Sequence, residues 1–188
     1  MQPNLIYYHL YICNAHWVLW LDEFMRYLID SKLLDSSRLH ICAQIKGKIY
    51  TADKIEAIIS DRYGEYIHNI SVSTDNSKYE GITLKKLYDT TCELTSNSRV
   101  LYAHSKGASR LITSMDTFPE IGRHDWRNMM QWYCISRYEK CFDLLSECDA
   151  VGCRLANQPV KHFSGNFWWA NSDYIKTLQD PSSDYRFC

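Results

Sequence analysis

The chain has 188 residues, of which 46% are hydrophobic and 23% are charged, and its formal net charge at pH 7 is −1. This length is typical of one domain with its own hydrophobic core, so disulfides are not needed for folding. Acidic and basic residues are mixed along the chain, without the broad positive surface that binds nucleic acid. We therefore expect a single domain over residues 1–188 and no nucleic-acid partner.

The cysteine pattern argues against zinc and against a disulfide framework. No Cys-x-x-Cys pair is present, and most of the cysteines lie in segments with apolar periodicity. We interpret them as reduced thiols that pack as small apolar residues. The N-terminus lacks the features of a signal peptide, and no run of about 20 apolar residues suggests a membrane span. These observations predict a cytoplasmic protein.

Strands and helices alternate along the first half of the chain. β-branched and aromatic residues predict strands over residues 4–12, 38–45, 66–72 and 99–104. Apolar residues at helical spacing predict helices over residues 16–34, around 55–59 and from residue 80 to 94. This alternation favours a largely parallel sheet with right-handed crossovers.

The second half is expected to contain a long loop, a long helix and two more strands. The loop follows His104, and loops of this length are usually functional or disordered. The helix is predicted over residues 124–148, with Cys134, Cys141 and Cys148 on one apolar face. Residues 149–154 and 162–170 are predicted to be strands, and residues 173–178 a short helix. The chain ends without a polar tail, so we expect that the natural protein continues.

Polar residues after the fourth predicted strand indicate a site. The apolar run 100–103 suits a strand buried on both faces of a sheet, and His104, Ser105, Lys106 and Gly107 follow it. Ligands in open α/β sheets bind beyond the carboxyl ends of such strands. The local sequence is equally compatible with a simple turn that carries a solvated lysine.

The expected topology brings three clusters of residues to one edge of the sheet. They are Tyr8 with His9, Tyr79 with Glu80, and His104 with Lys106. The glycine-rich dinucleotide and P-loop motifs, the Gly-x-Ser-x-Gly motif and the His-Glu-x-x-His motif are all absent. For Glu80, a helix N-terminal carboxylate stabilised by the helix dipole is at least as good an interpretation as a ligand-binding group.

Several motifs, taken in order, resemble those of a known family. They are YAHSKG at residues 102–107, WRNMM at 126–130, DAVG at 149–152 and HFSGNFWWA at 162–170. They are similar to motifs of a family of bacterial and large-virus glycosyltransferases that make capsular and other surface glycans. Residues 7–9 and 79–81 fit as well, so the resemblance covers nearly the whole chain. HFSGNFWWA is its most specific part, because two adjacent tryptophans after Gly-Asn are improbable in a generic strand.

The resemblance implies an α/β, GT-A-like fold, with a mostly parallel central sheet of about six strands flanked by helices on both faces. It also implies a hexosyl- or deoxyhexosyltransferase that moves a sugar from a nucleotide-sugar donor, a UDP- or dTDP-sugar, to a glycan acceptor. Most GT-A enzymes hold a divalent metal with Asp-x-Asp after the fourth strand. Here His104-Ser105-Lys106 stands in that place. His104 is then the one good ligand for Mn²⁺ or Mg²⁺, ions that prefer carboxylates.

The same resemblance suggests roles for individual residues. Donor-binding residues are Tyr8, His9, Tyr79, Glu80, His104 and Lys106, and acceptor-side residues are Gly165, Asn166, Trp168 and Trp169. Lys106 would face the diphosphate, whose negative charge grows as the sugar–phosphate bond breaks. Trp168 and Trp169 alternate across a strand, so one is expected to offer a platform for a sugar and the other to pack in the core.

Lys106 and Asp125 are the expected catalytic residues. For the general base, the sequence does not choose between Asp125 and the neighbouring Asp116, Glu120 and His124. We assign Trp126 and Arg127 to structure, because they open a long amphipathic helix.

Two other functions stay open. A non-catalytic glycan- or nucleotide-binding module would keep the fold without turnover, which the missing Asp-x-Asp allows. Another nucleotide-using α/β transferase has less support, because a glycine-rich first turn is absent.

Overall fold

The computed structural model describes residues 2–105, 118–158 and 160–181, without the side chains of residues 118–120. The strands are β1 (Asn4–Ile12), β2 (Ser37–Ile45), β3 (Ile67–Ser73), β4 (Arg99–His104), β5 (Ala150–Gly152), β6 (Leu155–Ala156), β7 (His162–Phe163) and β8 (Trp168–Asn171). The α-helices are α1 (Trp17–Asp30), α2 (Ala52–Tyr63), α3 (Gly81–Cys92), α4 (Phe118–Gln131), α5 (Tyr138–Leu144) and α6 (Ser172–Ile175). Short 3-10 turns, η1 (Leu33–Ser36) and η2 (Gly64–Tyr66), precede β2 and β3, and a π-helical turn, η3 (Trp132–Ser136), lies between α4 and α5.

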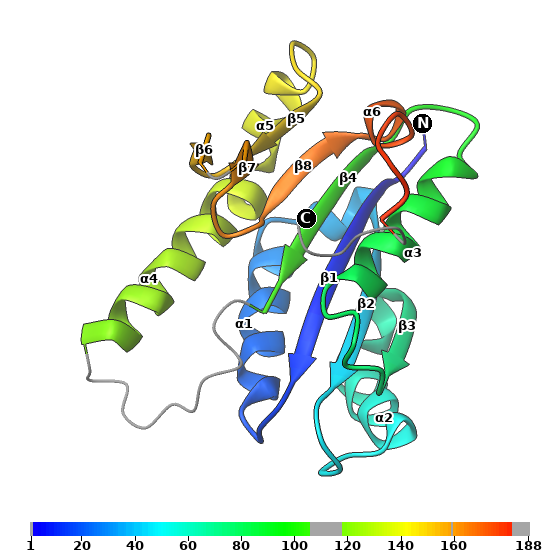
Figure 1. The fold of residues 1–188 in the computed structure, drawn as a ribbon, viewed down its shortest axis with the longest axis vertical. Helices are drawn as coiled ribbons and strands as arrows, with labels where there is room; N and C mark the ends of the chain where they lie inside the picture. Colours follow the sequence, from blue (N-terminus) through cyan, green and yellow to red (C-terminus); the bar gives the residue numbers. More distant parts are fainter. Residues whose placement is uncertain (1, 106–117, 159, 182–188) are drawn as a thin grey trace.

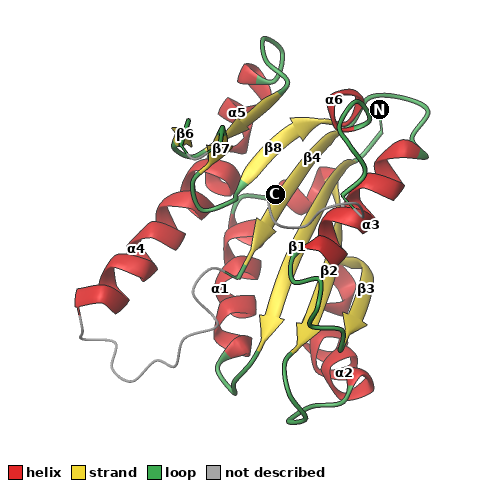
Figure 2. Cartoon of the chain, viewed as in Figure 1, coloured by secondary structure: helices red, strands yellow, loops and turns green. Residues whose placement is uncertain are grey.

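The six-stranded sheet has the order β3-β2-β1-β4-β8-β5 and is mixed rather than mostly parallel (Figure 1, Figure 2). β1 pairs in parallel with β2 and β4, and β2 with β3, as the alternation of strands and helices predicted. β8 is antiparallel to both β4 and β5. The chain passes from β5 to β8 through the β6–β7 pair without a crossover helix, so β8 returns in the opposite direction. The expectation of a mostly parallel sheet is therefore wrong at β8.

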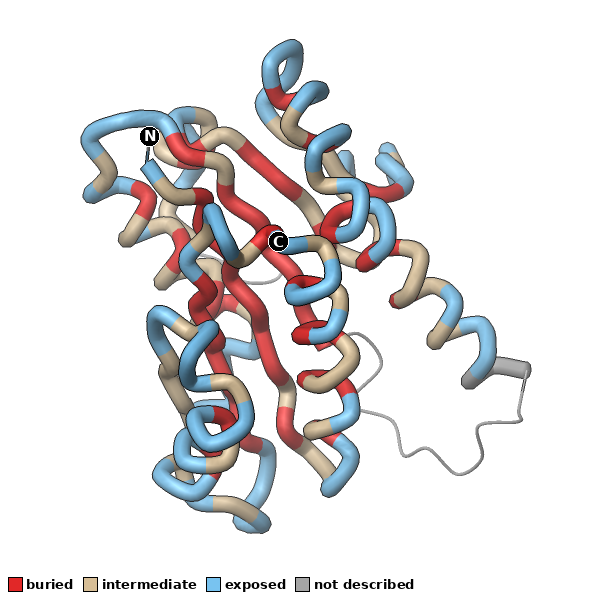
Figure 3. The backbone as a smooth tube through the Cα atoms, turned by 180° about the vertical axis from the view of Figure 1, so that it is seen from behind, coloured by how far each residue is buried: buried red, intermediate tan, exposed pale blue. Residues whose placement is uncertain are grey.

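Helices cover both faces of the sheet, as predicted (Figure 1). On the first face, called face A, side chains of α1, α2, η3 and α5 pack on Ile6, Tyr8 and Leu10 of β1. On the opposite face, called face B, α3 and α6 pack on Leu5 and Tyr7. The strands form the buried centre between these layers (Figure 3). None of the helices in the described part of the chain is both long and apolar enough to cross a bilayer.

Two predicted elements of the second half are divided in the structure. The helix predicted over residues 124–148 begins at Phe118, and η3 interrupts it before α5. Because α5 ends at Leu144, Cys148 lies beyond the helix and is exposed, whereas Cys134 and Cys141 are buried as expected. The strand predicted over residues 162–170 is divided into β7 and β8 by a turn. All cysteines within the described ranges are free thiols.

A buried ion pair links α1 to α4. Arg127 donates from Nε and Nη2 to the two carboxylate oxygens of Glu23, at 2.6 and 2.8 Å. The Arg127 guanidinium also lies 4.1 Å from the ring centroid of Trp20. Burial raises the pKa of Glu23, but hydrogen bonds and the charge of Arg127 outweigh it and hold this pKa below its ordinary value. These contacts support the assignment of Arg127 to structure.

We predict that Arg127→Met lowers the free energy of unfolding by about 3–5 kcal/mol, because it leaves the Glu23 carboxylate buried without its partner. The double variant Glu23→Met/Arg127→Met should be more stable than Arg127→Met, since no uncompensated charge remains. Urea unfolding of both single variants and the double variant measures this coupling. If the double variant lost as much unfolding free energy as the two single variants together, a direct interaction between Glu23 and Arg127 would be contradicted.

His40, on face B, is a buried histidine whose two ring nitrogens have no hydrogen-bond partner among the described residues. Its ring stacks on Tyr7 with centroids 4.6 Å apart. Burial lowers the pKa of His40 from 6.5 to about 4, and the nearby charges of His68, Lys86 and Arg38 act in the same direction. His40 is therefore neutral in the folded protein at neutral pH.

This buried histidine makes stability depend on pH. As the pH falls from about 6.5 to about 4, the unfolded chain binds a proton at His40 that the folded chain does not, so stability falls across this range. His40→Phe keeps the stack on Tyr7. It should reduce the loss of unfolding free energy between pH 7 and pH 4.5 by about 2–3 kcal/mol. Melting curves at the two pH values measure the difference. His16→Phe, at an exposed histidine, should behave as the wild type, and an unchanged pH dependence in His40→Phe would contradict the prediction.

Candidate functional site

Glu80 is the centre of a polar cluster on face B, at the carboxyl end of β4. It directly precedes α3, but its side chain makes no capping hydrogen bond to the helix. Its Oε2 accepts hydrogen bonds from the Tyr102 hydroxyl at 2.8 Å and from the Asn166 amide at 2.7 Å. Its Oε1 lies 3.3 Å from Nδ1 of His104. Three segments that are distant in the sequence therefore meet at one carboxylate. The Glu80 cluster, as we call it, consists of these residues and those that hold or flank them: His9, Glu80, Thr83, Tyr102, His104, Gly165, Asn166 and Trp168.

The partners of Glu80 are themselves held in place. Nε2 of His104 lies 2.8 Å from the carbonyl oxygen of Gly165, and because a carbonyl oxygen only accepts, this nitrogen carries a hydrogen. Oδ1 of Asn166 accepts from the indole N–H of Trp168 at 2.9 Å, which directs the amide NH₂ group toward Glu80. When Nδ1 of His104 is also protonated, His104 and Glu80 form an ion pair. The contacts thus close a ring through Glu80, His104 and the Gly165–Asn166 peptide.

The turn between β7 and β8 supplies Gly165 and Asn166 to this ring. Both have left-handed backbones, with φ of 88° and 53°. The backbone N–H of Asn166 donates to the Phe163 carbonyl at 3.0 Å. A Cβ at position 165 would lie 2.3 Å from Sδ of Met130 and 2.7 Å from Nε1 of Trp126. Glycine is therefore required at this position both by the backbone and by the close approach of α4. Asparagine tolerates the left-handed region better than most residues.

The electrostatics of the cluster keep Glu80 ionised. Burial raises the pKa of Glu80, but the charge of His104 and the hydrogen bonds that the carboxylate accepts outweigh it, so the pKa lies below the ordinary value. His9, which pairs with His104 across β1 and β4, donates to or accepts from Thr83 at 2.8 Å. Burial lowers the pKa of His9 to about 4. At neutral pH the cluster therefore contains a carboxylate and a neutral His9.

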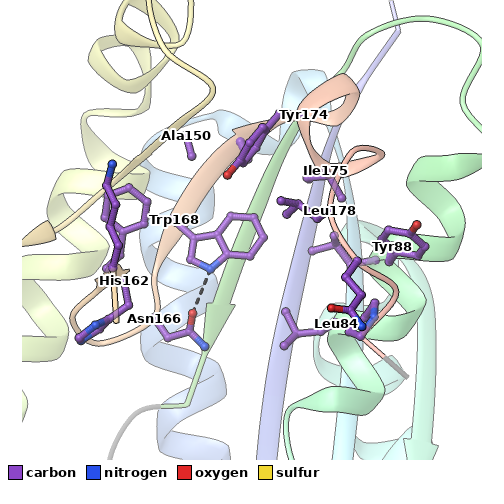
Figure 4. Close-up of a pocket in the computed structure, with 15 residues that line it drawn as sticks. Leu84, Tyr88, Ala150, His162, Asn166, Trp168, Tyr174, Ile175 and Leu178 are labelled. Carbon is purple, nitrogen blue, oxygen red and sulfur yellow. Dashed lines mark hydrogen bonds between the residues drawn. The ribbon is translucent and has the colours of Figure 1, made fainter. Parts of the chain in front are cut away.

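A pocket of about 420 Å³ opens beside the Glu80 cluster (Figure 4). Trp168 and Asn166 belong to both, and the Trp168 indole stacks on Tyr102 with centroids 5.4 Å apart. Leu84 and Tyr88 of α3 lie across the pocket from Trp168 (Figure 4). The walls are mostly apolar and aromatic, with the polar side chains of Lys161, His162, Asn166 and Gln179 among them, as is typical of small-molecule sites.

The structure brings together six of the predicted site residues: His9, Glu80, His104, Gly165, Asn166 and Trp168. Two others lie away from the cluster, on face A. Tyr8 stacks on Phe24 in the core and donates to the Trp20 carbonyl at 3.3 Å. Trp169 is fully buried, and its indole N–H donates to the Cys134 carbonyl at 2.6 Å. The alternation of side chains along β1 and β8 places both in the core instead of at the expected donor and acceptor positions.

Tyr79 and Asp125 lie outside the cluster. Tyr79 precedes Glu80 with a left-handed backbone and is 67% exposed. Asp125 is on α4, and its side chain is 72% exposed. Lys106 lies outside the described residues, so its catalytic role stays a prediction.

A divalent-metal site stays a prediction with little support among the residues that the structure describes. Among them, no group of three or more His, Cys, Asp or Glu side chains could hold an ion. The predicted ligand His104 directs its two ring nitrogens at Glu80 and at the Gly165 carbonyl.

Two members of the cluster, Tyr102 and Thr83, were not assigned a role from the sequence. For Tyr102 a signal existed, because residues two apart in a strand share a face and His104 was already a candidate. For Thr83 no signal existed, since its partner His9 is 74 residues away in the sequence.

A family model described as a domain of unknown function (DUF8361) matches residues 7–187. The match includes every residue of the Glu80 cluster. No curated protein matches the chain.

We predict that Gly165→Ala destabilises the protein more than Gly47→Ala does. Both glycines are left-handed, with φ of 88° and 85°, but a Cβ at Gly47 would meet nothing within 4 Å. Gly47→Ala should therefore cost only the backbone strain, about 1–2 kcal/mol, whereas Gly165→Ala adds an overpacking cost of about 1–3 kcal/mol against Met130 and Trp126. Urea unfolding of the two variants gives the difference. Equal losses would show that the approach of α4 does not constrain the turn.

Proposed function

We propose that this chain, which belongs to the DUF8361 family, is a glycosyltransferase that moves a sugar from a nucleotide-sugar donor to a glycan acceptor. The observation that carries the proposal is the Glu80 carboxylate, held by Tyr102, His104 and Asn166 beside an aromatic-walled pocket. Carboxylate and amide groups bind sugar hydroxyls, and an indole face binds the apolar face of a sugar ring. The resemblance of the sequence motifs to surface-glycan glycosyltransferases supports the same function.

In this proposal Glu80 accepts a hydrogen bond from a hydroxyl of the bound sugar. Oε2 already accepts two hydrogen bonds, whereas the one neighbour of Oε1 among the contacts described above is His104. A carboxylate oxygen can accept two hydrogen bonds, so Oε1 has capacity for a ligand. The Glu80 side chain is 34% exposed, which leaves it accessible.

The donor diphosphate must lie away from this carboxylate, because two negative charges repel each other. Cleavage of the sugar–phosphate bond increases the charge on the diphosphate, and a preorganised cation lowers the barrier. We assign this role to Lys106, which follows β4 two residues after His104. Trp168 and Asn166 then face the acceptor side, at the pocket. Asp125, the other predicted catalytic residue, would have to act from α4, outside the Glu80 cluster.

The alternative is a glycan- or nucleotide-binding module without turnover. It is favoured by the closed hydrogen-bond ring, in which both oxygens of Glu80 and both ring nitrogens of His104 have partners within the chain. Such a network suits holding a ligand better than moving a proton.

We predict that Glu80→Gln lowers the rate of sugar transfer or donor hydrolysis by about 10–100-fold, because a hydrogen bond to a charged group contributes about 1.5–3 kcal/mol. The assay uses UDP- and dTDP-sugars, with a melting curve of each variant to verify folding. Glu65→Gln, at an exposed glutamate on η2, is the matched control and should retain full activity.

Donor binding separates the two functions. A donor at 100 times its dissociation constant should stabilise the wild type by about 2.7 kcal/mol, which a thermal-shift measurement detects. Binding without turnover of any donor would favour the module. The absence of any donor binding would defeat the transferase and the nucleotide-binding module and leave a glycan-binding module.

A further inference from the structure

A second cavity, of about 550 Å³, lies along α4, η3 and α5 and reaches the end of β5. We call it the arginine groove. Its lining includes the aromatic residues Trp126, Trp132 and Tyr133 and the cationic residues Arg137, Lys140 and Arg154. Among the described residues, no carboxylate lines it. In a chain whose formal net charge is −1, the groove is a local concentration of positive charge.

The two arginines are the uncompensated charges of the groove. Lys140 pairs with Asp143 at 3.3 Å. Neither arginine forms an ion pair within the described ranges of the chain. The Arg137 guanidinium lies 5.4 Å from the ring centroid of Trp132, and the Arg154 guanidinium lies 5.7 Å from that of Trp126. Stacking of this kind orients a guanidinium and leaves N–H groups at its edge for an anionic ligand.

The aromatic residues of the groove are open to solvent. Trp132 is 45% exposed and Tyr133 is 52% exposed, and their rings meet edge to face with centroids 4.8 Å apart. Both belong to η3, and single π-helical turns within α-helices occur frequently at functional sites. Large aromatic side chains that are exposed side by side mark an interaction surface.

We propose that the arginine groove binds an acidic glycan. Carboxylate or sulfate groups of such a chain would receive the planar N–H groups of Arg137 and Arg154, and sugar faces would pack on Trp132 and Tyr133. An extended peptide that binds by strand addition fits less well, because that mode uses main-chain hydrogen bonds to a strand edge. The walls of the groove are largely helical, and β5, the edge strand that reaches it, has three residues.

The groove and the Glu80 cluster lie on either side of one turn. Trp126 lines the groove, and its Nε1 is 2.7 Å from the position of a Cβ on Gly165. The carbonyl of the same Gly165 faces His104 of the cluster. A glycan held in the groove would therefore lie next to the proposed transfer site, as an acceptor whose end reaches past the turn to Asn166 and Trp168. The binding itself rests on the groove alone, and only the role as acceptor rests on the proposed function.

The test is a titration of the intrinsic tryptophan fluorescence with defined hexasaccharides. A galacturonic acid hexamer carries carboxylates, a heparin hexasaccharide carries sulfates, and maltohexaose is the neutral control. We expect at least one acidic hexamer to bind and maltohexaose not to bind. Arg137→Gln/Arg154→Gln should weaken the binding by at least 10-fold. Arg26→Gln/Arg38→Gln removes the same charge from exposed positions outside the groove and should have no effect, and melting curves verify that both double variants fold.

Three results would overturn the inference: no binding of either acidic hexamer, equal weakening in the two double variants, or tighter binding of poly-glutamate than of the hexamers. The last would indicate an acidic peptide. Binding of an acidic hexamer in a protein that turns over no nucleotide sugar would leave the groove as proposed and defeat the transferase. Transfer to neutral acceptors without binding of acidic hexamers would do the reverse.

Discussion

The carboxylate of Glu80 holds together three segments that no local motif connects. It ties the start of α3 to β4 through Tyr102 and His104, and to the β7–β8 turn through Asn166, which is 86 residues away in the sequence. A buried charge is costly unless hydrogen bonds and opposite charges offset the loss of water, and here both are present. Removing any one partner would leave a partly buried carboxylate less well satisfied. The site therefore depends on the register of β8 against β4, which sets where Asn166 lies relative to Tyr102 and His104.

The second constraint acts from the other side of the same turn. The backbone of Gly165 lies so close to Met130 and Trp126 that no side chain fits between them. The position of α4, which Arg127 fixes against α1 through Glu23, thereby sets where the Gly165 carbonyl meets His104. Packing on face A and the polar geometry on face B are linked through one glycine.

Sequence reasoning succeeded where a periodic pattern decides the structure and failed where a single turn decides it. Alternating strands and helices predicted the parallel pairing among the four strands β1, β2, β3 and β4. The antiparallel direction of β8 depends on the absence of a crossover helix, which apolar periodicity does not reveal. The pattern across residues 124–148 is continuous, so the interruption at η3 gave no signal. Alternation correctly separated Trp168 from Trp169, although only the register against β4 shows that Trp168 faces the site. The same rule should have separated Tyr8 from His9, whose side chains lie on opposite faces of β1.

The two faces of the sheet differ in the polarity of their buried side chains. Face A carries the larger set of buried apolar side chains, together with the Glu23–Arg127 pair. Face B places His9, His40, Tyr102 and His104 under α3, where they contribute less to burial of apolar surface. Buried polar groups destabilise a fold unless they are paired, and His40, which has no partner among the described residues, shows that this face is not optimised for stability. Proteins accept such costs chiefly where the groups act on a ligand. The polarity of face B is in keeping with the binding site proposed at the Glu80 cluster, whereas the polar pair buried on face A, Glu23 with Arg127, joins two helices.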